Sequence, residues 1–283
     1  MPAFNNEVSS DNVNSHLHLH ILGSGSKGNC ALVEGPEGLI MIDDGFSRRE
    51  VLHRMGELDL AESDIHALVL THEHSDHVSG LSAWCRRWEG PMFASIGTAE
   101  TRKYLSELPF IEVNPGVSFH VAGIEVQTFA TSHDVVNPMG FRFSCNGDAI
   151  GYVTDTGSLS AFARELLRDA RILALESNHD VHMLKTGPYP RCLQERILSD
   201  SGHLSNAQAA TVLPELVTPH TEQIVAMHIS QKNNRPSLAV RALASSVGAT
   251  LDNDLGSSAT LMRDNVPDLH IRPAGQNRPI TIL

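Results

Sequence analysis

Apolar and polar residues alternate along much of the chain, as they do in the strands of a half-buried sheet. Residues 16–22 alternate strictly, and several short apolar runs are bounded by Gly, Pro, Asn or Asp. Asn146-Gly147 lies between two such runs, and this dipeptide is the strongest short hairpin signal. We expect strands at residues 16–22, 30–33, 39–42, 67–71, 92–95, 117–120, 124–130, 141–145, 149–154, 172–175 and 224–227.

Apolar residues at helical spacing, preceded by capping residues, predict helices between these strands. Ser47-Arg48-Arg49-Glu50 and Ser205-Asn206-Ala207-Gln208 both have the sequence of a capping box. We expect helices from about residue 48, at 78–88, 98–108, 158–170 and 205–216, and from about 236 onward. Pro214 is expected to bend or end its helix early. The helix at 158–170 is expected to bury four apolar side chains on one face: Leu159, Phe162, Leu166 and Leu167.

The order of these elements predicts the domain organisation. Two runs of strands interspersed with helices favour a sheet sandwich flanked by helices, an α+β fold, in a single domain from residue 16 to 283. Residues 1–15 are polar and rich in Asn and Ser, so we expect a disordered tail. Residues 263–283 give only weak signals and are expected to form loose strand or tail.

Composition and charge narrow the class of protein. The 283 residues are 41% hydrophobic and 19% charged, which is typical of a globular protein. The formal net charge of −12 excludes a generally basic surface for nucleic acid, so a polyanion would have to be attracted by a local field. The four cysteines form no C-x-x-C pair, which argues against a zinc ribbon and fits a reducing cytosol. No apolar run approaches the roughly 18 residues of a membrane span, and the start does not resemble a signal peptide, so we expect a cytoplasmic protein.

The segment Thr71-His72-Glu73-His74-Ser75-Asp76-His77 carries the strongest chemical signal. It directly follows an expected buried strand and contains four side chains of metal-ligand type: His72, His74, Asp76 and His77. Neutral imidazole and carboxylate are the ligands that zinc and similar divalent ions prefer. The alternative is a solvated turn that happens to be rich in histidine.

Further ligand types follow other expected strands, which argues for the metal site. His133, Asp155 and His228 each come directly after or close to the end of a strand. The three histidines at 16, 18 and 20 are a separate case, because they share one face of the first strand. That face is either solvated or able to hold an ion of its own.

Together these residues give the pattern H-x-H-x-D-H, a later His, a later Asp and a last His, which resembles the metallo-β-lactamase superfamily across residues 16–262. The resemblance implies a four-layer αββα sandwich with two divalent ions, zinc or manganese or alternatively iron. It places His72, His74 and His133 on one ion. It places Asp76, His77 and His228 on the other, with Asp155 bridging both. Asp43 would hold the ligand loop by hydrogen bonds.

The chemistry that this resemblance implies is hydrolysis. Two divalent ions lower the pKa of bound water towards neutrality, so that a metal-bound hydroxide attacks an ester or phosphoryl group. The chain lacks the Glu that replaces the second His in oxygen-reducing di-iron members, which argues against a redox role. A non-catalytic metal-binding regulator is disfavoured because the ligand set is complete.

More specific strings indicate a branch of the superfamily. LGSGSKGNC (22–30), THEHSDHVSG (71–80), ESNHD (176–180), MLKTGPYP (183–190), GHLSN (202–206) and HISQKNNRP (228–236) resemble the YycJ/WalJ-like family. This family implies a 5′-to-3′ double-stranded DNA exonuclease linked to DNA repair. The short interval between Asp155 and His228 excludes the large insertion of ribonuclease J-type members. The alternative is a small-molecule hydrolase of the same fold, such as a lactonase, thioesterase or cyclic phosphodiesterase.

The same resemblance suggests roles for residues beyond the ligands. Asp76 would orient the nucleophile, and His203 would bind the phosphate or protonate the leaving oxygen. The alternative for His203 is simple packing before the Ser205 helix cap. Asn178 or His179 would contact the substrate or the ligands, or else only hold the loop. Five basic residues could contact a nucleic-acid backbone or be solvated surface: Lys185, Arg191, Arg196, Lys232 and Arg235.

Overall fold

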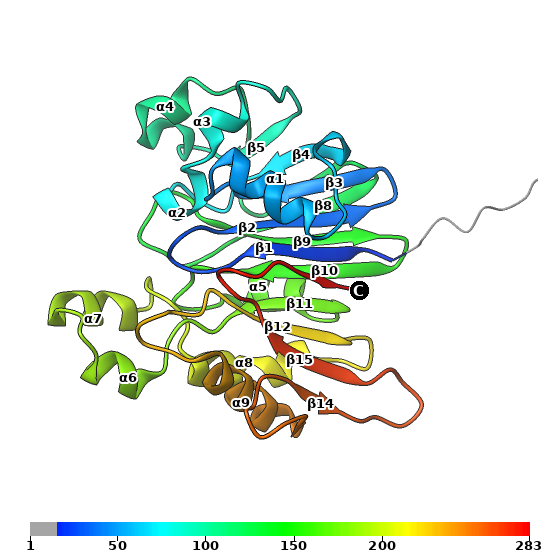
Figure 1. Ribbon diagram of the computed structural model, residues 1–283, viewed down its shortest axis with the longest axis vertical. Helices are drawn as coiled ribbons and strands as arrows, with labels where there is room; N and C mark the ends of the chain where they lie inside the picture. The colour runs from blue at the N-terminus through cyan, green and yellow to red at the C-terminus, as the bar shows by residue number, and fades with distance from the viewer. Residues whose placement is uncertain (1–15) are drawn as a thin grey trace, which may run out of the picture.

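Two β-sheets stack face to face, with helices on both outer sides (Figure 1). The computed structural model describes residues 16–283, so the tail predicted at 1–15 lies outside the described residues. The layers run helix, sheet, sheet, helix, which confirms the α+β sandwich expected from the sequence.

The first sheet has seven strands in the order β16-β1-β2-β3-β4-β5-β6. Its strands are β1 (His18–Gly23), β2 (Cys30–Gly35), β3 (Gly38–Ile42), β4 (Ile65–Val69), β5 (Met92–Ser95), β6 (Phe110–Val113) and β16 (Ile280–Ile282). The strands from β16 to β3 pair antiparallel, and those from β3 to β6 pair parallel. Its helices are α1 (Arg48–Gly56), α2 (Ser75–Val78), α3 (Leu81–Trp84) and α4 (Lys103–Ser106), with 3-10 turns at Glu62–Asp64 and Ala99–Thr101.

The second sheet has nine strands in the order β13-β14-β15-β12-β11-β10-β9-β8-β7. They are β7 (Ser118–Val121), β8 (Ile124–Ala130), β9 (Met139–Cys145), β10 (Asp148–Val153), β11 (Ile172–Glu176), β12 (Gln223–Met227), β13 (Thr250–Leu251), β14 (Ala259–Leu261) and β15 (Leu269–Pro273). Its outer face packs against α5 (Ala161–Leu167), α8 (Asn206–Leu216) and α9 (Pro236–Val247). Two further helices, α6 (Val181–Thr186) and α7 (Arg191–Leu198), project from one end of the sandwich (Figure 1).

The apolar pattern of the strands explains this layering. Leu19 and Ile21 of β1 point into the core between the two sheets, whereas Leu22 packs under the helices of the first layer. Successive side chains of a strand point to opposite faces, so a strand buried on both sides has few polar positions. Burying these two faces, and the matching faces of the second sheet, produces three apolar layers.

Two expected helices are shorter than the apolar pattern indicated. Residues 78–88 form parts of α2 and α3, which are separated at Ser79-Gly80. A Cβ at Gly80 would lie 2.0 Å from the Phe46 carbonyl oxygen, so the loop after β3 packs directly on this backbone. Residues 98–108 form a 3-10 turn and α4, because Arg102 between them is extended with φ −135°.

Two other expectations are wrong for reasons of tertiary structure. Phe162 is 48% exposed rather than buried, because the short helix α5 presents Ala163 and Leu167 to the core. The end of the chain is not loose strand or tail. β15 pairs parallel with β12, and β16 pairs with β1, the first strand of the described chain. Pro214 also does not end its helix early, because it lies inside α8, which continues to Leu216.

Across 16–283, no helix combines the length and apolar character that crossing a bilayer requires.

The parallel strands determine where polar strand ends meet. β3 and β4 run parallel in one sheet, and β10, β11 and β12 run parallel in the other. Carboxyl ends of parallel strands meet at the same edge of a sheet. In Figure 1 this edge lies at the end of the sandwich that carries α2, α6 and α7.

Candidate metal centre

The loop after β4 carries the histidine motif and is held by backbone hydrogen bonds. The Asn29 N–H donates to the Asp76 carbonyl oxygen at 2.7 Å, and the Asp44 N–H donates to the His77 carbonyl oxygen at 2.8 Å. Gly45 permits this packing, since a Cβ there would lie 1.8 Å from the Asp76 carbonyl oxygen. The ligand loop is therefore fixed by the loops that follow β1 and β3.

Three strands end at residues with a left-handed backbone conformation, and all three belong to the centre or support it. Asp43 after β3, Asp155 after β10 and His228 after β12 have φ values of 58°, 53° and 51°. A side chain in this left-handed region costs conformational energy, and such residues concentrate at functional sites. At Asp155 and His228, this strained conformation directs the carboxylate and the imidazole towards the side chains of the histidine motif.

The first group of ligand atoms consists of three imidazoles. His72, His74 and His133 each offer a ring nitrogen, and these nitrogens lie within 4.8 Å of one another. His74 Nδ1 and His133 Nε2 are 3.2 Å apart. His133 Nδ1 lies 3.1 Å from the Gly202 carbonyl oxygen, and a hydrogen bond there leaves Nε2 free for an ion. His72 Nε2 is buried without a hydrogen-bond partner among the described residues.

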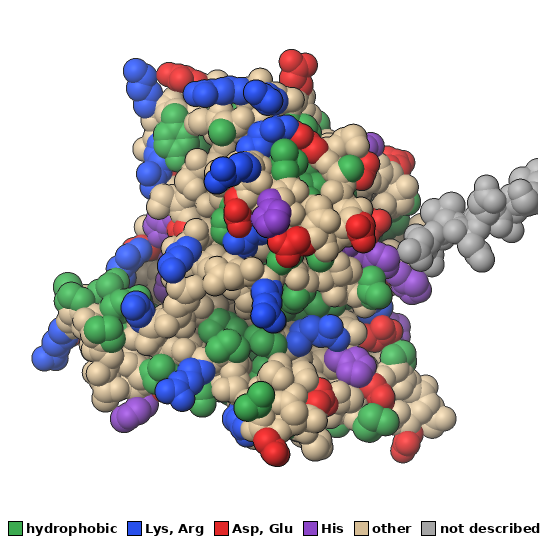
Figure 2. Space-filling model, in the orientation of Figure 1, with side chains coloured by type: hydrophobic (Ala, Val, Ile, Leu, Met, Phe, Trp, Pro, Cys, Tyr) green, Lys and Arg blue, Asp and Glu red, His purple; other side chains and the backbone are tan. Residues whose placement is uncertain are grey.

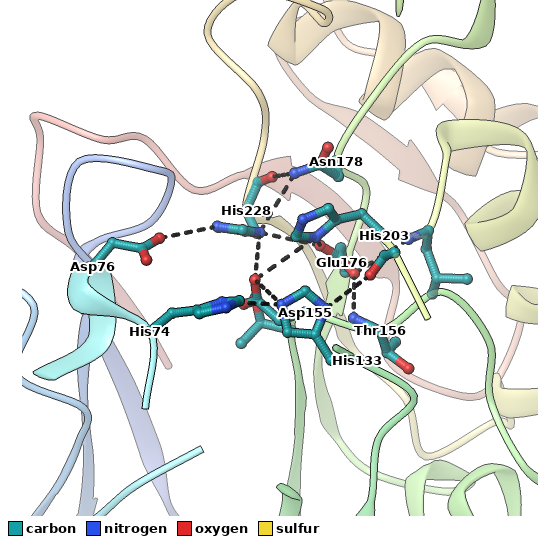
Figure 3. A network of polar contacts seen from close by, with 12 residues as sticks. His74, Asp76, His133, Asp155, Thr156, Glu176, Asn178, His203 and His228 are labelled. Carbon is teal, nitrogen blue, oxygen red and sulfur yellow. Dashed lines mark hydrogen bonds and ion pairs between the residues drawn. The ribbon is translucent and has the colours of Figure 1, made fainter. Parts of the chain in front are cut away.

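The second group combines carboxylate and imidazole. Asp76, His77 and His228 likewise offer atoms within 4.8 Å of one another. His228 Nε2 lies 3.8 Å from Asp76 Oδ2 and is another buried nitrogen without a hydrogen-bond partner in residues 16–283. In Figure 3, His74 and Asp76 approach from one side of the site, and His133, Asp155 and His228 face them from the other.

Asp155 lies between the two groups. Its Oδ2 is 3.3 Å from His77 Nε2, and its Oδ1 is 3.9 Å from His133 Nε2. The structure thus brings together all seven residues that the sequence suggested as ligands. Buried nitrogens without partners are costly unless something binds them, so this donor set fits two divalent ions of the zinc class.

Asp43 supports the second group without facing the cavity. Its Oδ2 lies 2.7 Å from His77 Nδ1 and also accepts a hydrogen bond from the Thr71 hydroxyl at 2.8 Å. Its Oδ1 accepts the Thr71 N–H at 2.8 Å. A carboxylate on Nδ1 fixes the ring orientation and leaves His77 Nε2 directed at the site, which is the arrangement expected from the sequence.

Glu176 is a central residue that the sequence reasoning did not select. Its Oε1 lies 2.8 Å from His203 Nδ1 and 3.1 Å from His228 Nδ1. Its Oε2 accepts the backbone N–H of Thr156 at 2.8 Å and that of Leu204 at 3.2 Å. Two signals in the sequence pointed to it: its place at the end of an apolar strand, as for Asp155 and His228, and its position in the string ESNHD (176–180).

Burial and neighbouring charges shift the pKa values of several groups in the centre. Burial raises the pKa of Glu176, but nearby His203 and the hydrogen bonds from His203 and His228 outweigh it and lower that pKa to about 2. Burial likewise opposes ionisation of Asp155, yet the charges of His228 and His77 hold its pKa well below the usual range. Burial lowers the pKa of His72 well below its ordinary value, so this imidazole is neutral and able to bind an ion.

A cavity of about 330 Å³ opens over these groups. The lining includes Asp76, Asp155, His203, His228 and Asn178. It also includes Ser26, His74, Ser75, Arg102, Tyr189, Leu193, Arg196, Ile197 and Ser230.

The remaining suggested residues divide between the cavity and its surroundings. Asn178 lines the cavity, and its side-chain NH₂ donates to the His228 carbonyl oxygen at 2.8 Å. His179 is fully buried beside Ser205, away from the cavity lining. Arg196 reaches the cavity, and its guanidinium pairs with Asp134. The other suggested basic residues are exposed outside the lining: Lys185, Arg191, Lys232 and Arg235.

Comparison with known proteins places this fold and site in a family. Residues 39–229 match the model of the beta-lactamase superfamily domain. The chain is 36% identical to exodeoxyribonuclease YycJ of Bacillus anthracis over 79% of this chain and 86% of the relative. It is 33% identical to exodeoxyribonuclease WalJ of Streptococcus pneumoniae strain D39 over 77% and 84% respectively.

Solved structures agree on the fold. The metallo-beta-lactamase fold protein YhfI from Bacillus subtilis superposes with a TM-score of 0.66 at 13% identity, over 94% of this chain and 99% of that one. Zn²⁺-bound PqqB from Methylobacterium extorquens gives a TM-score of 0.63 at 15% identity, over 93% and 99%. The chain therefore belongs to the beta-lactamase superfamily, in the family of the YycJ and WalJ proteins, and is a metal-dependent hydrolase.

Proposed function

We propose that this hydrolase is a dinuclear phosphodiesterase that degrades double-stranded DNA from 5′ to 3′ in DNA repair. The observation that carries the proposal is the pairing of His203 with buried Glu176 at the wall of a cavity that four of the seven expected ligands also line: His74, Asp76, Asp155 and His228. The names of the relatives support DNA as the substrate, because both are called exodeoxyribonucleases.

The ligand residues would hold the ions and keep them apart. His72, His74 and His133 offer three nitrogens for one ion, and Asp76, His77 and His228 offer a mixed set for the other. Asp155 lies close enough to both sets to be shared. Two divalent ions at such a site supply Lewis acidity for a phosphoryl oxygen and lower the pKa of water. Asp76 faces the cavity, where its carboxylate would orient a water molecule by accepting a hydrogen bond from it.

His203 is placed to handle a proton on the substrate side. The Glu176 carboxylate 2.8 Å from Nδ1 holds the proton on that nitrogen and leaves Nε2 for a ligand in the cavity. To donate from Nε2, the imidazole must carry a proton on both nitrogens, and the Glu176 carboxylate would then face the Nδ1 proton. His203 would therefore donate a proton to the leaving oxygen of a phosphodiester or hydrogen-bond its phosphate.

Two arginine side chains place positive charge at the cavity, although the chain as a whole is acidic. Arg102 lines it, and the only hydrogen bond its guanidinium makes within residues 16–283 runs from Nε to the Glu73 carbonyl oxygen at 3.1 Å. Arg196 also lines it, but Asp134 neutralises much of its charge. Figure 2 shows lysine and arginine side chains dispersed among acidic ones over one face of the molecule. Recognition of a polyanion would thus be concentrated at Arg102 and at the ions.

Tyr189 and Leu193 favour a nucleic acid over a small polar ester. Both belong to the α6–α7 region and line the cavity together with the charged groups. An aromatic ring beside a phosphate-binding site can stack on a base, which stabilises single-stranded or frayed ends irrespective of sequence. A small-molecule hydrolase remains the second candidate, since the cavity volume of about 330 Å³ is within the range of small-ligand sites.

The test is a cleavage assay with end-labelled duplex DNA in Mn²⁺ or Zn²⁺, beside a lactone and a thioester. We expect processive loss of label from 5′ ends. His203→Gln should lower kcat by about 10²- to 10⁴-fold while the metal content is unchanged. His182→Gln, an exposed histidine on α6, is the matched control and should retain activity. Intact DNA together with hydrolysis of the lactone or thioester would overturn the proposal.

A further inference from the structure

A second cluster of metal-ligand type lies on the first sheet, outside the catalytic centre. His18 and His20 are two residues apart on β1 and so point to the same face of the sheet. Glu34 is the direct cross-strand partner of His18 on β2. β1 begins at the end of the sandwich opposite α2 and α7, beside the C-terminus (Figure 1), and Figure 2 shows histidine side chains gathered at that end.

The three side chains converge on one oxygen atom. His18 Nδ1 lies 3.1 Å from Glu34 Oε2, and His20 Nε2 lies 3.0 Å from the same oxygen. The two imidazole rings are nearly perpendicular, with an interplanar angle of 86°. All three ligand atoms lie within 4.8 Å of one another. A tetrahedral ion with bonds of about 2.0–2.2 Å requires ligand atoms about 3.3 Å apart, so these separations need only a small adjustment.

Neighbouring residues orient the His20 imidazole towards Glu34 and largely bury it. Its Nδ1 lies 2.9 Å from the Thr281 hydroxyl on β16, and a hydrogen bond there directs Nε2 at Glu34. The side chains of His20 and His18 are only 4% and 17% exposed, whereas that of Glu34 is 42% exposed. An ion would therefore reach the cluster past Glu34, and water would complete its coordination.

We propose that His18 Nδ1, His20 Nε2 and a Glu34 carboxylate oxygen form a third, structural site for a divalent ion of the zinc class. The site would join the hairpin of β1 and β2, and through Thr281 it would involve the last strand, β16. Its role is to clamp the two ends of the described chain together. It does not depend on the hydrolytic function, because none of these residues lines the catalytic cavity.

The experiment counts Zn²⁺ per chain by elemental mass spectrometry after equilibration with Zn²⁺ and removal of the free ion. We expect about three ions in the wild type and about two in His18→Gln and in Glu34→Gln, with unchanged circular dichroism. His53→Gln is the control, since His53 and Glu57 form a histidine–carboxylate pair without a third ligand in their group. It should retain about three. An equal count in the wild type and both variants would overturn the proposal.

Thr281→Val tests whether the Thr281 hydroxyl positions His20 for ion binding. Valine has the shape of threonine but lacks the hydroxyl that contacts His20 Nδ1. We expect the affinity of the third ion to fall by about 10- to 100-fold, with no change in the two ions of the catalytic centre. The readout is a competition titration of Zn²⁺ against a chromogenic chelator. If the affinity of the third ion is unchanged, the positioning role assigned to Thr281 is wrong.

Discussion

Glu176 joins two histidines and two backbone amides through a single buried carboxylate. Glu176→Gln keeps the shape but offers an NH₂ group to one side, either to the histidines or to the backbone N–H groups. On that side two hydrogen-bond donors then face each other, so the hydrogen bonds of Glu176 on that side are lost. We expect kcat to fall by about 10- to 100-fold, with weaker metal binding through His228. Steady-state kinetics and metal content measure this, with Glu165→Gln on the exposed side of α5 as the control. Unchanged kinetics would contradict the role of Glu176.

Asp44 is a buried carboxylate next to the one that supports His77. Burial and the neighbouring Asp43 raise the pKa of Asp44 to about 7, and neither of its oxygens has a hydrogen-bond partner among the described residues. A carboxyl with a raised folded-state pKa is protonated in the folded protein but ionised in the unfolded chain between about pH 4 and 7. Its contribution to stability is therefore present below pH 4 and is lost as the pH rises to about 7.

Asp44→Asn should remove the contribution of this carboxyl to the pH dependence of stability. We expect the variant to gain stability relative to the wild type as the pH increases from 5 to 8, because the amide has no proton to lose. Urea unfolding at several pH values measures the difference. A constant difference between the two proteins across this range would show that Asp44 is ionised throughout.

The residues of the metal centre differ in how far the sequence could predict them. The ligands in 72–77 lie close together in the chain, so their spacing alone indicated a metal site. Glu176 belongs to no such cluster, and its role depends on His203 and His228, which reach it only after folding. The left-handed conformations of Asp43, Asp155 and His228 were equally hidden, since each is a non-glycine residue in a strained state that tertiary contacts impose.

Among the elements, α5 shows how a periodic pattern can select the wrong face. The sequence placed Phe162 with Leu167 in the core, but only Leu167 is buried. Leu167→Ala removes buried methyl groups and leaves a cavity, so we expect a loss of about 2–5 kcal/mol. Phe162→Ala should change the free energy of unfolding by less than about 0.5 kcal/mol, as for other exposed positions. Chemical denaturation of both variants measures this, and a larger effect at Phe162 would contradict the observed orientation.

Elements defined by local signals were predicted well, and those defined by distant pairing were not. The Asn146-Gly147 hairpin and the Ser205 capping box depend on neighbouring residues, and both form as expected. β16 has no such signal, because its partner β1 lies at the other end of the described chain. The break between α2 and α3 lies at Gly80, whose backbone packs on the loop after β3, and α4 begins after the extended Arg102; no periodicity reveals either.

The candidate metal centre involves both sheets, because its seven expected ligands follow strands of each. His72, His74, Asp76 and His77 follow a strand of the first sheet, and His133, Asp155 and His228 follow strands of the second. The resemblance to a known superfamily supplied this pairing of distant residues, since spacing alone indicated only the first group. Ions bound between the sheets would hold them together at this edge, in addition to the apolar core between them.

Removal of metal should therefore lower the stability of the entire fold. A ligand at 100 times its Kd stabilises the folded state by about 2.7 kcal/mol, and for a chain of this size we expect Tm to fall by about 5 °C or more after chelation. The experiment is best done in Glu34→Gln, so that only the catalytic ions are removed. Restoring Zn²⁺ or Mn²⁺ should recover the Tm. The same treatment of Asp155→Ala should have little effect, because that variant lacks the carboxylate that lies between the two groups of expected ligands. If chelation leaves the Tm of Glu34→Gln unchanged, the ions do not connect the two sheets.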